Sequence, residues 1–197
     1  MSLTRKASAE ITRQNIIQAA FEIAGDSGYE ALTTNALIQR AGIAKGTLYH
    51  HFKNLDEVVF AVIRKIVEDC MQSVPIEQFN SMREYLYAVG QYQLDCFFQD
   101  PRLINTVYGF LPKGMQDPQF RLLAQELLDS VCAQISPAIK QFYSNTVSDE
   151  KVTRAIRMVD IFSIGFGVHQ SIYQDKQRYQ AIWQDFVDML ESYLNNS

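Results

Sequence analysis

The stretch AGIAKGTLYHHF, from Ala41 to Phe52, gathers side chains that can bind an anion. Lys45, Tyr49 and Lys53 follow one another at i, i+4 and i+8, so on a helix they share one face. Two further hydrogen-bond donors lie beside them, Thr47 and His50. All of these side-chain types donate to the phosphates of nucleic acids, and the major groove of B-DNA admits a helix. The pattern therefore predicts a helix that contacts DNA.

The adjacent histidines His50 and His51 raise metal binding as an alternative. Consecutive helical residues point about 100° apart, and no third residue of a metal-binding type lies nearby in the sequence. The three cysteines are widely spaced and form no CxxC pair, which argues against a zinc site and a disulfide framework. They are Cys70, Cys96 and Cys132. We therefore expect no metal, no cofactor, and buried thiols in a reducing cytoplasm.

The charge of the chain is unevenly distributed. The 197 residues carry a formal net charge of -4, with a sequence pI near 5.4. Residues 1–65 hold eight Lys and Arg against six Asp and Glu, a net charge of +2. The remaining residues hold ten against sixteen, a net charge of -6. Only the first third of the chain suits a polyanionic partner.

The elements that position the cationic helix form a predicted helix-turn-helix. A first helix over about 9–26 has an apolar face, and Gly28 is suited to end it. A short helix follows to Arg40, which Thr33 or Thr34 can N-cap. The turn 41–43 then leads into the helix over about 45–51. Such a motif can also serve packing alone, but its outer face would then carry charges of both signs. From Ala31 to Leu55 acidic residues are absent.

The rest of the chain also follows a helical period, and no strand-like alternation persists. We expect further helices at about 56–72, 80–99, 101–109, 118–143, 148–173 and 176–195. The Asp-Pro pairs at 100–101 and 117–118 are helix start signals, and Pro137 should kink or end its helix. The predicted fold class is all-α, with about nine helices. A three-helix DNA-binding domain over 1–55 would precede a larger helical domain over 56–197, to which ligand binding and dimerisation are assigned below.

Residues 11–60, which include LTTNALIQRAGIAKGTLYHHFKNLDEVVF, resemble the DNA-binding domain of the tetracycline-repressor (TetR) family of bacterial transcription regulators. The resemblance rests on Gly28, Thr33-Thr34, Ile38, Ala41-Gly42-Ile43, Lys45-Gly46-Thr47-Leu48-Tyr49 and His51-Phe52. It implies a repressor that binds a palindromic operator in double-stranded DNA as a homodimer. It also implies that the following residues lie at the DNA: Thr33, Thr34, Lys45, Gly46, Thr47, Tyr49, His50, His51 and Lys53.

Three positions depart from the family pattern. Ala44 stands where a serine usually caps the recognition helix, and the loss of such a cap costs about 1 kcal/mol. Gln39 replaces a common small alanine. Leu55 replaces a frequent lysine, which removes one expected phosphate contact. These changes leave the helix-turn-helix in place and predict a modest affinity for each half of the operator.

The last two helices are predicted to form a two-fold dimer interface. The helix over 148–173 is apolar nearly all round from Ile156 to Val168, so it needs neighbours on every side. It also carries small residues at i, i+4 and i+8, which allow close helix contact. The residues assigned to the interface are Ser163, Gly167, Ser171, Trp183, Phe186 and Leu190. The alternative is a core formed within one chain, whereas the family resemblance implies a four-helix bundle between two chains.

Aromatic residues are dense between Tyr85 and Tyr173, with a few polar residues set among them. Such stripes commonly form a core, but members of the resembled family usually hold an inducer pocket in this half. A largely apolar pocket with few polar contacts suits a small hydrophobic effector. The assigned ligand residues are Tyr92, Asp95, Phe97, Tyr108, Phe110, Asp160, Phe162, Phe166 and His169. Each polar one could instead be satisfied by neighbouring groups.

Two other functions compete with a ligand-responsive regulator. A helical enzyme is one, but the sequence has no Ser/His/Asp order, phosphate-binding glycine loop or paired-carboxylate motif, so we expect no enzyme. A DNA-binding architectural protein without an effector is the other. No apolar run approaches the about 20 residues of a membrane helix. The first ten residues contain no signal-peptide pattern, and we expect a cytoplasmic protein.

Overall fold

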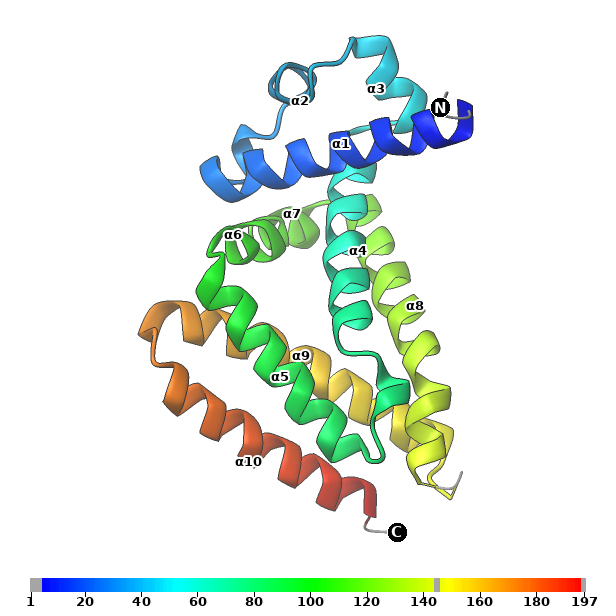
Figure 1. The fold of residues 1–197 in the computed structure, drawn as a ribbon, viewed down its shortest axis with the longest axis vertical. Helices are drawn as coiled ribbons and strands as arrows, with labels where there is room; N and C mark the ends of the chain where they lie inside the picture. Colours follow the sequence, from blue (N-terminus) through cyan, green and yellow to red (C-terminus); the bar gives the residue numbers. More distant parts are fainter. Residues whose placement is uncertain (1–4, 144–145, 196–197) are drawn as a thin grey trace. The chain divides into compact units, whose positions relative to one another are not determined.

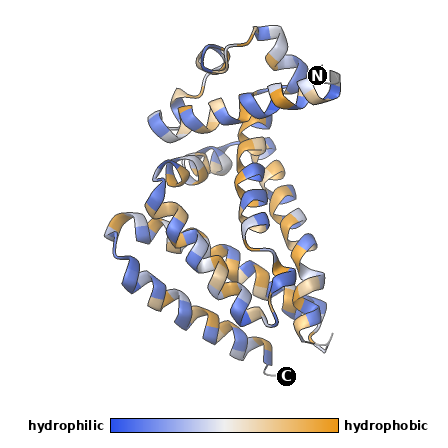
Figure 2. Cartoon of the chain, in the orientation of Figure 1, coloured by the Kyte–Doolittle hydropathy of each residue, from blue (hydrophilic) through white to orange (hydrophobic). Residues whose placement is uncertain are grey.

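The computed structural model describes residues 5–143 and 146–195, which form ten α-helices and no strand. The all-α prediction is confirmed (Figure 1). Hydrophilic and hydrophobic residues are interspersed along the helices (Figure 2). This is expected of amphipathic helices, in which apolar residues recur every three or four positions. The helices are α1 (Arg5–Ser27), α2 (Thr34–Ala41), α3 (Lys45–His51), α4 (Leu55–Ser73), α5 (Met82–Gln99), α6 (Arg102–Tyr108), α7 (Leu111–Gln116), α8 (Pro118–Phe142), α9 (Asp149–Tyr173) and α10 (Lys176–Asn195). Two short 3-10 helices cover Tyr29–Ala31 and Ile76–Gln78.

Nine of these helices correspond to predicted ones, and α7 is additional. It has Pro112 in its first turn, and its Lys113 forms an ion pair with Asp56 of α4. Asp117 caps α8 as expected, because its Oδ1 accepts from the N–H groups of Gln119 and Phe120 at 2.9 and 3.2 Å.

Of the two expected effects of Pro137, a kink or an end of the helix, the end does not occur, because α8 runs through this residue to Phe142. Proline removes one N–H donor and disturbs the preceding turn. Residues on both sides are nevertheless buried in the core, Cys132 before the proline and Ile139 after it. We infer that burial on both sides holds the helix together across the proline.

The residue contacts divide the chain into two compact units. Unit 1 contains the residues up to Val67 together with Pro101–Ala124, and unit 2 contains Glu68–Asp100 together with the residues from Gln125 onward. These contact units differ from the predicted domains, because α6 and α7 belong to the same unit as α1–α3. The domain boundary after residue 55 stays a prediction.

Unit 1 is built on α1, whose predicted apolar face is buried: Ile16, Ala20 and Ile23. Helix α6 packs closely against α1. Asn105 Nδ2 of α6 donates to the carbonyl of Gly25 at 2.9 Å. A Cβ on Gly25 would lie 2.5 Å from the Cβ of Arg102, so glycine is what permits this approach. The Phe60 ring of α4 packs on Phe120, with centroids 4.6 Å apart.

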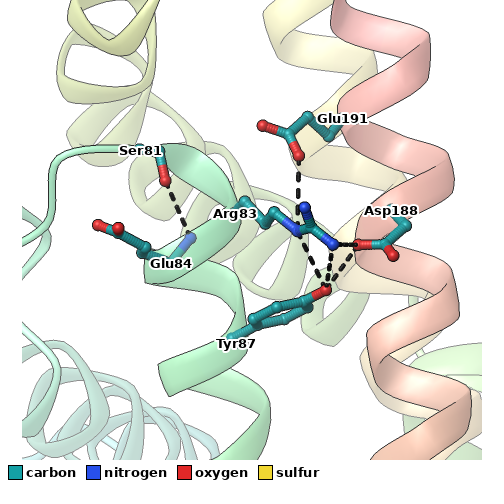
Figure 3. A network of polar contacts seen from close by, with 6 residues as sticks. All are labelled: Ser81, Arg83, Glu84, Tyr87, Asp188 and Glu191. Carbon is teal, nitrogen blue, oxygen red and sulfur yellow. Dashed lines mark hydrogen bonds and ion pairs between the residues drawn. The ribbon is translucent and has the colours of Figure 1, made fainter.

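Unit 2 places α5, α9 and α10 side by side (Figure 1). A polar network on the surface joins α5 to α10 (Figure 3). The Tyr87 hydroxyl donates to Asp188 Oδ1 at 2.6 Å and accepts from Arg83 Nη2 at 3.0 Å. Arg83 also pairs with Asp188 at 2.8 Å and Glu191 at 3.8 Å. The hydrogen bond to Asp188 raises the pKa of Tyr87, so the phenol stays a donor.

No helix within residues 5–143 and 146–195 combines the length and the apolar character that spanning a bilayer requires.

Candidate nucleic-acid interface

Side-chain and backbone caps fix the turn between α2 and α3. Thr33 Oγ1 accepts from the N–H of Ala36 at 3.2 Å, so Thr33 is the N-cap of α2. Gly42 ends α2 with a φ of 64°, a left-handed conformation that glycine adopts without steric cost. Its N–H donates to the carbonyls of the preceding turn. The predicted helix-turn-helix is confirmed.

The inner faces of α2 and α3 pack on α1. Leu37 of α2, Leu48 of α3 and Phe52 just after α3 are buried. Asn15 Nδ2 of α1 donates to the carbonyl of Ala41 at 2.9 Å and holds the end of α2. Sequence reasoning missed Asn15, because nothing in its spacing marks a polar residue that binds a distant carbonyl.

The outer face of α3 presents the cationic and hydrogen-bonding side chains. Tyr49 is 48% exposed, although an aromatic ring gains free energy from burial. The Lys45 ammonium lies 6.0 Å from the Tyr49 ring centroid. Of the nine residues predicted at the DNA, six are exposed: Thr33, Lys45, Gly46, Tyr49, His50 and Lys53. Three are half-buried: Thr34, Thr47 and His51.

Lys53 is held by the start of α4. Its backbone N–H donates to Glu57 Oε2 at 2.8 Å, and its ammonium lies 3.5 Å from Glu57 Oε1. Asn54 Oδ1 accepts from the N–H of Glu57 at 2.9 Å and caps the helix. The Lys53 side chain is 89% exposed, so its ammonium can exchange this partner for another anion. Ala44, which precedes α3, makes no side-chain cap.

The rings of His50 and His51 lie close to each other. Their ring centroids lie 5.3 Å apart at 78°. Among the described residues, no group of three His, Cys, Asp or Glu side chains could hold a metal ion.

The nine predicted ligand residues do not form one site within either unit. Tyr108 and Phe110 belong to unit 1, where Phe110 packs on Phe120 with centroids 5.8 Å apart. Phe162 and Phe166 belong to the core of unit 2. Phe162 stacks on Phe186 at 3.8 Å and 6°, and both rings contact Trp183. Neighbouring rings cover Phe162 and Phe166 in this structure, and their assignment to a ligand stays a prediction.

Two polar ligand candidates are surface groups. Asp95 forms an ion pair with Lys176 and accepts from Gln91 Nε2 at 3.0 Å, and these hydrogen bonds lower its pKa. His169 is exposed and stacks on Tyr173, with centroids 6.0 Å apart. Their assignment to a ligand stays a prediction.

The other three ligand candidates, Tyr92, Phe97 and Asp160, are half-buried in unit 2. Tyr92 accepts a hydrogen bond from Ser73 Oγ at 3.3 Å. Burial raises the pKa of Asp160, although the positive charge of Arg157 acts to lower it. Three cavities of unit 2 lie elsewhere, beside Trp183, Tyr85 and Tyr143.

The residues predicted for a dimer interface lie mostly in the core of their own chain. Gly167, Trp183, Phe186 and Leu190 are buried, and the backbone carbonyl of Ser163 accepts from Gln93 of α5. Side chains that their own chain covers leave little surface for a partner, and the assignment of these residues to an interface stays a prediction. The exposed apolar residues of the two helices are different ones: Met158, Ile161, Ile164, Ile172, Ile182 and Met189.

The fold and the exposed face of α3 are those of a helix-turn-helix DNA-binding protein. Residues 16–62 match the family described as "Bacterial regulatory proteins, tetR family". The HTH-type transcriptional repressor Rv1474c of Mycobacterium tuberculosis is 25% identical over 189 residues, which cover 94% of each chain. Residues 16–62 thus match the DNA-binding domain of the tetR family, and the chain is similar to a TetR-type transcriptional repressor along nearly its whole length.

Solved structures share the fold along almost the whole chain. GusR of Salmonella enterica superposes with a TM-score of 0.74 at 18% identity and covers 98% of both chains. FadR of Bacillus subtilis, solved in complex with stearoyl-CoA, has a TM-score of 0.69 at 18% identity. This match covers 93% of the present chain and 98% of FadR. At such identities the likeness is one of fold alone.

Proposed function

We propose that this regulator is a repressor that binds a palindromic operator as a homodimer and is released by a small hydrophobic effector. The observation that carries the proposal is the outer face of α3, where Lys45, Tyr49 and His50 are exposed while Leu48 is buried. This division leaves the donor groups free for DNA and uses the apolar ones for packing.

Each recognition helix α3 would enter a major groove, and a two-fold dimer would place the pair about 34–36 Å apart, one turn of B-DNA. The nine residues assigned to DNA would divide between phosphates and base edges. Lysines position the protein by charge, whereas side chains that reach base edges carry the sequence preference.

The exposed apolar residues of α9 and α10 support the dimer. Ile161, Ile172 and Met189 are 70%, 68% and 66% exposed in the single chain. Met158, Ile161 and Ile164 recur every three residues along one side of α9. An exposed apolar stripe of this kind marks an interaction surface, and a two-fold axis would pair it with the same stripe of a second chain.

An effector would bind in the helical half and prefer the conformation that does not fit the operator. The complex of FadR with stearoyl-CoA supports a ligand of apolar character. Tyr92, Phe97 and Asp160 remain the candidates for its contacts. Because the coupling is reciprocal, the operator must weaken effector binding by the same factor by which the effector weakens operator binding.

Two experiments test the function. Selection from a random duplex library should yield a palindromic site that the protein binds. A thermal-shift screen of apolar ligands should then find a compound that releases this duplex in a mobility-shift assay. A protein that binds the duplex but responds to no ligand would support the effector-free architectural alternative. Failure to enrich any sequence would contradict the regulator itself.

A further inference from the structure

Unit 1 holds a cavity of about 210 Å³ beside the end of α3. Its walls come from α1, the end of α3, the first half of α4 and the start of α8. Pockets for drug-sized ligands are larger, about 300–1,000 Å³, so this cavity suits a smaller molecule. None of the residues assigned to an effector lines it.

One face of α4 forms a large part of the wall. Glu57, Phe60 and Arg64 recur at i, i+3 and i+7, so they project from the same side of the helix. The apolar part of the lining, called the floor below, consists of Phe52, Phe60, Ala61 and the exposed Leu123. Phe52 and Phe60 are buried, and Phe60 is supported from behind by Phe120. A ligand would therefore meet a fixed apolar surface.

Two arginines also line the cavity, Arg13 and Arg64. Arg13 lies over the Phe52 ring, 5.1 Å from its centroid. Among residues 5–143 and 146–195, no carboxylate lies within ion-pair distance of either arginine. The carboxylate in the wall, Glu57, is bound to Lys53 through both the backbone N–H and the ammonium. Within the described residues, the cavity thus offers two arginines without a carboxylate partner.

We propose that this cavity is a second ligand site, which binds a small organic carboxylate with an apolar or aromatic body. A planar guanidinium matches the two oxygens of a carboxylate, and the floor would cover the body of the ligand. A bare phosphate would satisfy the arginines but would leave the apolar floor exposed. The proposed site is separate from the residues assigned to the effector, whereas one of its lining residues, His51, is also assigned to DNA.

The test is titration of the full chain with benzoate by calorimetry or NMR, with neutral benzamide and inorganic phosphate as matched probes. Benzoate should bind at least about 10-fold more tightly than either, because only benzoate uses both the cations and the floor. Equal binding of benzoate and benzamide would overturn the role of the arginines. If phosphate and benzoate bind equally tightly, the apolar floor contributes nothing to binding. That result would also contradict the proposal.

Variants test the same site. Arg64 is exposed, so Arg64→Gln should fold normally and weaken benzoate about 10-fold while benzamide binding stays unchanged. Arg154→Gln removes an exposed arginine of unit 2 and should leave benzoate binding unchanged. Arg13 packs on Phe52 and is therefore less suitable for substitution. Unchanged benzoate binding in Arg64→Gln, or no benzoate binding by the wild type at millimolar concentration, would overturn the proposal.

Discussion

The indole Nε1–H of Trp183 donates a hydrogen bond to the backbone carbonyl of Leu86 at 2.7 Å. This bond joins α10 to α5 in the core of unit 2. Gly90 lies one turn further along α5, and a Cβ there would be 2.1 Å from the same Nε1 atom. The absence of a side chain at Gly90 is therefore what allows the indole to reach α5.

We expect Gly90→Ala to destabilise the protein by about 1–3 kcal/mol or more, because the buried indole would have to move away from α5. Urea unfolding measures the change. The matched control is Gly46→Ala in α3, where an added Cβ meets no atom within 4 Å. The control should gain up to about 1 kcal/mol from helix propensity. Equal stability of the two variants would contradict the close packing of Trp183 on Gly90.

The same Gly46→Ala variant tests how closely α3 approaches DNA. Its Cβ has room in the free protein, so folding should be preserved. If the backbone at Gly46 lies against the DNA, a methyl group there should weaken operator binding about 10-fold or more. Fluorescence anisotropy with a selected duplex gives the affinity. An unchanged affinity would show that the backbone at Gly46 does not lie against the DNA.

The dimer should depend on the exposed stripe of α9 rather than on the buried aromatic residues. We expect a wild-type dimer in sedimentation at micromolar concentration and a monomer for Ile161→Asp, because a buried unpaired charge is strongly unfavourable. Leu122→Asp is the control, since Leu122 is 60% exposed on α8, outside this stripe. A folded wild-type monomer, or a dimer that tolerates Ile161→Asp, would contradict the proposed interface.

Asp160 should make the protein less stable as pH rises. Burial raises its pKa above the ordinary value of 3.8, so the folded state holds the proton more tightly than the unfolded state. This contribution is complete below 3.8 and is lost as pH rises through the raised pKa. Asp160→Asn should therefore increase the melting temperature at pH 7, and the gain should shrink toward pH 4.

Asp95 serves as a control with the opposite pH dependence of stability, because hydrogen bonds from Lys176 and Gln91 lower its pKa. Asp95→Asn should cost at most about 1 kcal/mol at pH 7, as expected for an exposed ion pair. This cost should vanish as pH falls through the lowered pKa. A melting temperature for Asp160→Asn that falls at pH 7 would contradict the burial of its charge.

The sequence predicted the local structure of the DNA-binding part well, because its signals are local. The Thr33 cap, the left-handed Gly42 and the buried Leu48 each depend on residues within one or two turns. The contact of α6 with α1 depends instead on a distant pair, Asn105 and Gly25, and no periodicity reports such a pair.

The sequence alone could not assign the faces of α9 and α10, for a related reason. Helical period shows that a helix has an apolar side, but it does not show whether that side meets its own chain or a partner. Trp183 and Phe186 form the most apolar stripe of α10 and fill the core of the chain. The exposed Ile161 and Ile172 could be recognised only after the core was known.

The most direct test of a DNA-binding function is the affinity of wild type and the double variant Lys45→Ala/Tyr49→Ala for a selected palindromic duplex, measured over a range of salt concentrations. We predict that the logarithm of the wild-type affinity falls linearly with that of salt, as counterions are released from phosphates. Each substitution should cost about 1–3 kcal/mol if its side chain reaches a base, with the circular dichroism spectrum unchanged. A folded double variant that binds the duplex as tightly as the wild type would contradict the assignment of α3 as the recognition helix.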